Sequence, residues 1–230
     1  TALIGAWILS NASAHAASDA PRLVVSITID QLRSDYMQAF KSLYGERGFK
    51  RLMKDGYVCL NAEYPFVSPD RASAVACLFT GASPYENGIV ANMWMDRKIL
   101  RPVFCVDDEK YPSLPKGTAS SPQYLRTSTL VDELKMASAG TAQIYAISPF
   151  RDAAILAAGH AGDGAFWIND ETGQWVTSSY YGGYPAWASA YDRTNPLWEK
   201  VGEFKWTPTN DLVGNFNYLL GSAVTNSFEH

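Results

Sequence analysis

Apolar runs and helix-spaced apolar positions alternate along the chain from residue 22 to residue 147. Residues 22–30 form a continuous apolar run, which is typical of a strand buried on both faces of a parallel sheet. Residues 31–55 repeat their apolar positions with helical spacing and end at a glycine. Residues 57–64 predict a second strand. Strand and helix therefore alternate at the start of the chain.

Two further helices and one more strand complete this pattern. Pro69 stands at a first helical position behind a serine N-cap, so we expect a helix over 72–79. Residues 127–139 are clearly amphipathic and are capped by Gly140, and residues 143–147 predict another buried strand. The order β-α-β-α-β predicts an α/β domain with a mainly parallel sheet.

The remaining segments have a different residue composition and pattern. Residues 99–125 contain four prolines and many polar residues, which predicts an excursion over the surface. Beyond residue 160, tryptophans and tyrosines are mixed with glycines in short alternating runs, which favours a β-rich insert. We therefore divide the chain into an α/β core over 21–160 and an insert or cap over 161–230. The aromatic side chains of the insert either pack its own core or form a platform for a sugar or nucleobase.

Residues 1–20 have the pattern of a secretory signal. A short apolar core is followed by small polar residues that include Ala14-His15-Ala16, an A-x-A cleavage pattern. The initiator Met and a basic region are missing, so we expect the sequence to begin partway through a signal peptide. A disordered tail is the alternative. The signal interpretation predicts a periplasmic or secreted protein.

Composition excludes two classes of function. The net charge of −4 and the pI near 5.4 argue against an electrostatic nucleic-acid binder. No apolar run reaches the roughly 18 residues that a membrane span needs. Three cysteines leave at least one unpaired within the chain: Cys59 and Cys105 have the option of a disulfide, and Cys77 is expected to be a small buried residue.

Two positions in the sequence are candidate functional sites, judged from their neighbouring residues alone. Asp30 ends the first apolar run, where open α/β sheets place their ligands, so it either binds a metal or caps the following helix. Ser68 and Asp70 precede the predicted helix over 72–79. The start of that helix favours an anion such as phosphate or sulfate, although both residues also serve as simple caps.

Longer stretches resemble a known family. Residues 30–37, DQLRSDYM, are similar to the D-Q-x-R-x-D-Y-L motif of the phosphate-irrepressible (flavobacterial) alkaline phosphatases, a branch of the alkaline phosphatase superfamily. This branch is related to the type I phosphodiesterases and nucleotide pyrophosphatases. The similarity continues in order through 45–52, 79–84, 88–96, 121–122, 130–134, 158–160 and 164–167.

The resemblance implies a fold and a chemistry. The fold would be the N-terminal portion of an alkaline-phosphatase-like sandwich. The function would be that of an exported, metal-dependent phosphoester hydrolase, in which two zinc ions assist the attack of a threonine on phosphorus. Asp30 matches a zinc ligand, and Asn92 matches the asparagine that hydrogen-bonds a phosphoryl oxygen.

Three positions depart from the family pattern. Arg71 stands at the nucleophile's position, and Phe150 and Asp152 replace a lysine and an arginine that contact phosphate. Arg151 lies one residue out of register and would substitute for them only if the backbone shifts. An arginine stays protonated and cannot attack phosphorus. We expect Arg71 to form an ion pair with Asp30.

Two consequences of these departures remain open. Ser68 or Ser73 is a possible substitute nucleophile, one just before and one just inside the same helical turn. The family's remaining zinc ligands come from later sequence, so we expect them outside this chain. The alternative function is a catalytically silent family member that binds a phosphorylated or sulfated ligand, or a protein partner, through the same cleft.

Overall fold

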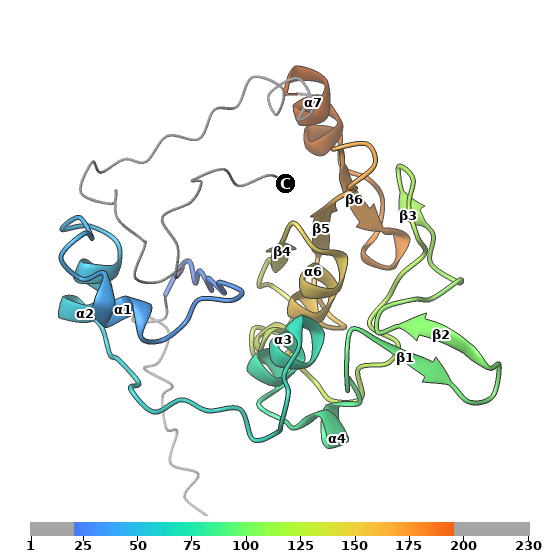
Figure 1. The fold of residues 1–230 in the computed structure, drawn as a ribbon. Helices are drawn as coiled ribbons and strands as arrows, with labels where there is room; N and C mark the ends of the chain where they lie inside the picture. Colours follow the sequence, from blue (N-terminus) through green and yellow to red (C-terminus); the bar gives the residue numbers. More distant parts are fainter. Residues whose placement is uncertain (1–20, 196–230) are drawn as a thin grey trace, which may run out of the picture. The chain divides into compact units, whose positions relative to one another are not determined.

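The computed structural model describes residues 21–195, so the predicted signal segment lies outside the described residues (Figure 1). The chain divides into two compact units, with the boundary between Tyr44 and Gly45. Within the described residues, no helix has the length and apolar character that crossing a membrane requires.

The described part of the first unit, residues 21–44, contains one short helix, α1 (Tyr36–Ala39). The Tyr44 hydroxyl donates to the Tyr36 carbonyl oxygen over 2.8 Å, and Arg33 pairs with Asp35 over 2.6 Å. The strand predicted over 22–30 is wrong for this structure, because these residues have no strand assignment and Leu23 is 79% exposed. An apolar run forms a strand only when a neighbouring strand pairs with its backbone.

The single helix predicted over 31–55 is also wrong. The helical spacing is split between α1 and α2 (Phe49–Asp55), and turns separate the two. Gly48 precedes α2 with a φ of 71°, a left-handed conformation that glycine adopts without strain. The strand predicted over 57–64 is absent as well, and Tyr57 is 95% exposed.

The second unit is built on a four-stranded sheet with the order β3-β6-β5-β4. Its strands are β3 (Ser113–Leu114), β4 (Tyr145–Ile147), β5 (Gly164–Ile168) and β6 (Trp175–Ser178). β4 and β5 are parallel, and the other two pairs are antiparallel. The α/β prediction is confirmed, whereas the expectation of a mainly parallel sheet is wrong for the described strands, because two of these three pairs are antiparallel. The strand expected at 143–147 exists as β4, but Tyr145 and Ile147 are exposed, and within residues 21–195 β4 pairs with β5 alone.

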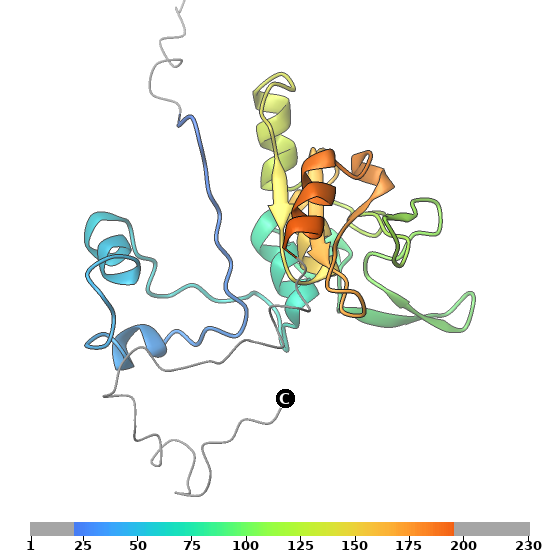
Figure 2. The same cartoon turned by 90° about the horizontal axis from the view of Figure 1, so that it is seen from above.

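Helices α3 (Arg71–Thr80) and α6 (Arg151–Ala158) lie side by side next to this sheet (Figures 1 and 2). α6 connects β4 to β5 in a β-α-β crossover. Ala72 and Ala76 of α3 are fully buried, and small side chains let two helices pack closely. The core comprises Ala72, Val75, Ala76, Ile89, Cys105, Val106, Leu125, Ala154, Ile155, Leu156, Ala158, Ala165, Trp167 and Val176.

The remaining elements surround this core. They are α4 (Pro84–Asn87), the hairpin of β1 (Met93–Asp96) and β2 (Arg101–Phe104), α5 (Leu130–Ala137), the 3-10 helix η1 (Ser179–Tyr181) and α7 (Ala186–Thr194). The helices expected over 72–79 and 127–139 are confirmed as α3 and α5. Gly140 has a φ of 81°, and its N–H donates to the Lys135 carbonyl oxygen over 2.8 Å at the end of α5.

The surface excursion predicted over 99–125 is wrong in part. This segment contains β2 and β3, and both Cys105 and Val106 are fully buried. Its buried serines are satisfied by hydrogen bonds: Ser121 Oγ donates to Asp108 Oδ2 over 2.5 Å, and Ser120 Oγ donates to the Thr118 carbonyl oxygen over 2.8 Å. Polar sequence therefore enters the interior because each polar group finds a partner there.

The later part of the chain extends the sheet. β5 and β6 join β4 and β3, and Trp167 is buried in the core. Residues 196–230 lie outside the described part of the chain, so the insert or cap over 161–230 stays a prediction.

All three cysteines are free, Cys59 exposed and Cys105 buried, whereas Cys77, which was expected to be buried, is partly exposed.

Asp132 ties α5 to the turn that follows α6. Its carboxylate accepts hydrogen bonds from the backbone N–H groups of Thr129, His160 and Ala161 over 2.7 to 2.8 Å. The His160 ring also lies 3.1 Å from the same carboxylate, and its Nε2 lies 3.1 Å from the Leu125 carbonyl oxygen. His160 is thus held in a structural position.

This carboxylate predicts a loss of stability in acid. Burial alone raises the pKa of Asp132, but hydrogen bonds from Thr129, Ala161 and His160 outweigh it and leave the pKa below its usual 3.8. A carboxyl group with a lowered folded pKa stabilises the protein above its unfolded pKa and loses this contribution as the pH falls through the folded pKa. We expect urea unfolding to show a falling free energy of unfolding below about pH 4.

The matched variant for this prediction is Asp132→Asn, which keeps an oxygen acceptor and removes the titrating group. Its free energy of unfolding is expected to be lower at neutral pH and to fall less steeply in acid. An equally steep fall in the variant would mean that other carboxylates cause the acid sensitivity.

Candidate functional site

The start of α3 is fixed by a capping box. Asp70 is the N-cap, and its Oδ1 accepts hydrogen bonds from Ser73 N over 2.9 Å and from Ser73 Oγ over 2.7 Å. Asp70 N in turn donates to Ser73 Oγ over 3.0 Å. The predicted cap Ser68 is therefore wrong: Ser68 is exposed, has a φ of 57° and precedes the cap by two residues. The sequence S-P-D offered both side chains, and the aspartate makes the cap.

The capping box also determines what Ser73 can do. Ser73 is 1% exposed, and its hydroxyl donates to the Asp70 carboxylate. A hydroxyl committed in this way has no free path to a substrate. The structure thus places the two candidate substitute nucleophiles differently, with Ser68 exposed and Ser73 buried within the cap.

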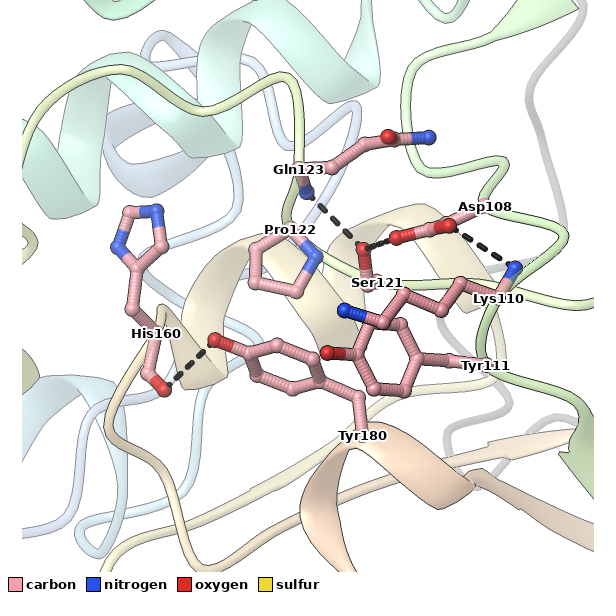
Figure 3. Close-up of a pocket in the computed structure, with 8 residues that line it drawn as sticks. All are labelled: Asp108, Lys110, Tyr111, Ser121, Pro122, Gln123, His160 and Tyr180. Atoms are coloured by element: carbon pink, nitrogen blue, oxygen red, sulfur yellow. Dashed lines mark hydrogen bonds between the residues drawn. The ribbon is translucent and has the colours of Figure 1, made fainter.

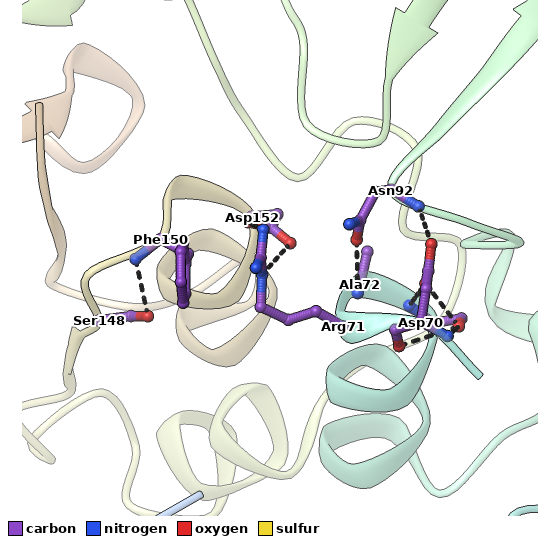
Figure 4. Close-up of polar contacts among 8 residues, drawn as sticks. Asp70, Arg71, Ala72, Asn92, Ser148, Phe150 and Asp152 are labelled. Atoms are coloured by element: carbon purple, nitrogen blue, oxygen red, sulfur yellow. Dashed lines mark hydrogen bonds and ion pairs between the residues drawn. The ribbon is translucent and has the colours of Figure 1, made fainter. Parts of the chain in front are cut away.

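Asn92 is attached to the same helix start. It immediately precedes β1, and its Oδ1 accepts a hydrogen bond from Ala72 N over 2.8 Å. Its own backbone N–H donates to Asp70 Oδ2 over 2.5 Å. With Oδ1 engaged, the Asn92 amide nitrogen points toward the side on which Asp152 lies (Figure 4). Asp70, which the motif comparison did not single out, therefore positions Asn92.

Arg71 forms an ion pair across two helices. Its Nε lies 2.9 Å from Asp152 Oδ2, and its Nη2 lies 3.2 Å from Asp152 Oδ1 (Figure 4). The two side chains are 25% and 12% exposed. The guanidinium carbon also lies 3.7 Å from the centre of the Phe150 ring, a cation–π contact. Arg71 thus contacts both of the other positions that depart from the family pattern; we call Arg71, Phe150 and Asp152 the arginine cluster.

The ion pair expected between Arg71 and Asp30 is not the one that forms. Arg71 pairs with Asp152, which stands 81 positions away in the sequence and in the first turn of the adjacent helix α6. Asp30 lies in the first unit, which the structure does not place relative to the second. Counting along the motif gave no signal for this pairing, because it depends on how α3 and α6 pack.

Arg151 faces a different part of the second unit. Its Nη1 donates to Ser120 Oγ over 3.0 Å, and its Nη2 lies 2.8 Å from Asp107 Oδ1. Its guanidinium carbon lies 5.4 Å from the centre of the Phe104 ring. The guanidinium is therefore engaged by the segment around β2, and its predicted role in substrate binding stays a prediction.

Metal and thiol chemistry can be tested against the residues present. Within 21–195, no group of three or more His, Cys, Asp or Glu side chains is placed to hold a metal ion. The described residues alone therefore do not fit the predicted zinc pair.

Burial, assisted by the nearby Asp152 charge, raises the pKa of the Cys105 thiol to about 12. Cys105 stays protonated at neutral pH and is not a nucleophile.

A separate pocket of about 310 Å³ lies on the second unit (Figure 3). Its wall includes Tyr111 and Tyr180, whose rings meet edge to face with centroids 5.0 Å apart. The Tyr180 hydroxyl donates to the His160 carbonyl oxygen over 3.1 Å. The other lining residues are Asp108, Lys110, Ser121, Pro122 and Gln123. Ser121, Pro122 and His160 belong to stretches that resemble the family, but none of the site residues predicted from sequence lines this pocket.

Comparison with known proteins gives consistent results. Residues 24–223 match the family model of type I phosphodiesterase / nucleotide pyrophosphatase. Alkaline phosphatase PafA of Elizabethkingia meningoseptica is 36% identical over 91% of this chain and 41% of its own length. Alkaline phosphatase PhoV of Synechococcus elongatus is 35% identical over 91% of this chain and 38% of its own. The chain thus spans about 40% of the length of these curated relatives.

A solved structure agrees with the sequence comparison. The crystal structure of wild-type PafA superposes with a TM-score of 0.75 at 32% identity, covering 80% of this chain and 36% of that one. A second PafA structure, with the same score and identity over 81% of this chain and 37% of that one, carries four substitutions, at a threonine, an asparagine, a lysine and an arginine. The threonine and asparagine are 21 positions apart, as are Arg71 and Asn92 here, and the lysine and arginine are two apart, as are Phe150 and Asp152.

Proposed function

This chain belongs to the type I phosphodiesterase / nucleotide pyrophosphatase family, in the branch of the alkaline phosphatases PafA and PhoV, and we propose that its protein binds phosphate esters at the start of α3 without hydrolysing them there. We further propose an exported protein, on the signal-like pattern of residues 1–20. Phosphoester hydrolysis, the activity of the relatives, would be the ancestral activity of this site.

One observation carries the proposal: the arginine cluster occupies the first turns of α3 and α6. The guanidinium of Arg71 is paired with Asp152 and stacked on Phe150. In-line attack on phosphorus needs a nucleophile with an available lone pair, and a guanidinium that stays protonated offers none. The neighbouring Ser73 hydroxyl is committed to Asp70, and the Cys105 thiol stays protonated.

The same geometry favours a phosphoryl group as ligand. The start of the ten-residue helix α3 carries the positive end of its dipole, while its N–H groups at Ala72 and Ser73 already donate to Asn92 and Asp70. Arg71 offers a fork of N–H donors, and Asn92 offers an amide nitrogen on the same side. The spacing shared with the four substituted PafA positions supports placing Arg71 and Asn92 at one site.

A second candidate function is hydrolysis through Ser68. Its exposed hydroxyl, two residues before the cap of α3, supports this alternative. Zinc ions, if held by Asp30 and by ligands beyond this chain, would lower the pKa of the attacking hydroxyl and polarise the phosphoryl oxygens. Within this chain, the Ser68 side chain would have to reach the phosphoryl group held at Asn92.

Hydrolysis assays on the full-length protein distinguish the two functions. With chromogenic phosphate mono- and diesters and added Zn²⁺, we expect the turnover of the wild type to equal that of Ser68→Ala and Ser73→Ala, at background level. Turnover that Ser68→Ala or Asp30→Ala abolishes would contradict the binding proposal and establish the hydrolase. Thermal unfolding of each variant serves as the folding control.

A further inference from the structure

The pair between Arg71 and Asp152 joins the first turns of two helices. Arg71 is the first residue of α3, and Asp152 is the second residue of α6. Two nitrogens of one guanidinium face two oxygens of one carboxylate, at 2.9 and 3.2 Å. This is the two-pronged arrangement by which arginine binds either a carboxylate or a phosphate.

The charges at this place are unbalanced without Asp152. The start of a helix carries partial positive charge, so Arg71 is unfavourable at the start of α3, and an anion is favourable at the start of either helix. The N-cap residue of α6, Phe150, makes no side-chain cap hydrogen bond. Asp152 therefore neutralises a guanidinium and lies at a helix start where an anion is stabilised.

The guanidinium is held from a second side as well. The Phe150 ring lies 3.7 Å from its central carbon, which fixes the plane of the fork independently of Asp152. Arg71 also keeps 25% of its side-chain surface exposed. An incoming oxyanion would thus meet a pre-oriented fork whose two donors are already taken by an internal carboxylate.

We propose that Asp152 is an intramolecular competitor of the ligand at Arg71. A phosphate oxyanion binds by displacing the Asp152 carboxylate from the guanidinium, so the Asp152 side chain sets the affinity of the site for phosphate. The ligand class rests on the proposed function, and the competition rests on the ion pair itself. The proposal differs from a positioning role, in which Asp152 would hold Arg71 for the ligand and its removal would weaken binding.

Calorimetric titration of the full-length protein separates these roles. Inorganic phosphate and phenyl phosphate are titrated at low salt into the wild type, Asp152→Asn and Asp152→Ala. Asparagine keeps the shape and one acceptor of the side chain but removes the competing charge. We expect both variants to bind each phosphate about tenfold more tightly than the wild type, because the guanidinium no longer exchanges one anion for another.

Asp163→Asn is the matched control for the change in net charge. Asp163 pairs with Lys135 over 2.8 Å, outside the arginine cluster, and its variant is expected to bind phosphate as the wild type does. Equal tightening in Asp152→Asn and Asp163→Asn would show a general charge effect and overturn the proposal. Unchanged or weaker binding in both Asp152 variants would overturn it too, while the binding function would stand.

The two titrants, inorganic phosphate and phenyl phosphate, also test the identity of the ligand separately from the competition by Asp152. Tightening for inorganic phosphate alone would keep Asp152 as the competitor and contradict the ester as ligand. If neither phosphate binds to the wild type or to the Asp152 variants, the proposed function fails, and the competition fails with it. Thermal unfolding confirms that each variant is folded before it is titrated.

Discussion

Replacing Gly159 with alanine is expected to lower the free energy of unfolding by at least about 3 kcal/mol. Gly159 has a φ of 61° and a ψ of −154°, a conformation that is essentially restricted to glycine. An added Cβ would lie 2.8 Å from Asp132 Oδ1 and closer still to Thr129 Oγ1. The substitution therefore combines backbone strain with displacement of the carboxylate that joins α5 to the turn after α6.

Urea unfolding of the full-length protein measures this loss, and Gly140→Ala is the matched control. Gly140 also has a positive φ, 81°, but nothing lies within 4 Å of an added Cβ. Its variant reports the backbone strain alone, about 1 kcal/mol. If Gly159→Ala costs no more than Gly140→Ala, the contact with Asp132 and Thr129 does not contribute.

The second large effect is expected in catalysis. The triple variant Arg71→Thr, Phe150→Lys and Asp152→Arg replaces the whole arginine cluster with the residue types of the family pattern. In the full-length protein, we expect it to hydrolyse phosphate monoesters at least about 100-fold faster than the wild type, because it supplies a hydroxyl nucleophile and two phosphate contacts together.

The single variant Arg71→Thr is the control for this prediction. It leaves the Asp152 carboxylate without its arginine and beside the site, where it repels a phosphate dianion. We therefore expect little or no turnover from the single variant. A triple variant that folds, binds phosphate and stays as inactive as the wild type would show that hydrolysis was lost outside this cluster.

Local sequence signals predicted the helices of the second unit better than the strands. α3 was predicted because Pro69 follows a polar capping candidate, and α5 was predicted because it has an amphipathic spacing and a glycine after its end. The runs over 22–30 and 57–64 have strand-like composition, yet composition does not supply the partner that a strand needs. The buried Cys105 and Val106 were missed because the prolines and polar residues around them suggested a surface segment.

The candidate site was predictable in its positions but not in its contacts. The motif comparison singled out Arg71, Asn92, Phe150 and Asp152 by spacing. It could not show that Arg71 contacts two of the others, because Arg71 and Asp152 are 81 positions apart and meet only through the packing of α3 against α6. Asp70 was one of two caps that the sequence offered, and only the hydrogen bonds of the structure show that it also holds Asn92 in place.

The most direct test of the central claim is one calorimetric titration of the full-length protein with phenyl phosphate in the presence of Zn²⁺. Binding gives discrete heats that saturate, whereas turnover gives a sustained heat flow after each injection. We expect saturable binding heats in the wild type, no sustained heat flow, and loss of the binding heats in Arg71→Gln. Sustained heat flow in the wild type, or unchanged binding in Arg71→Gln, would contradict the account of Arg71 as a ligand-binding residue at a site without hydrolysis.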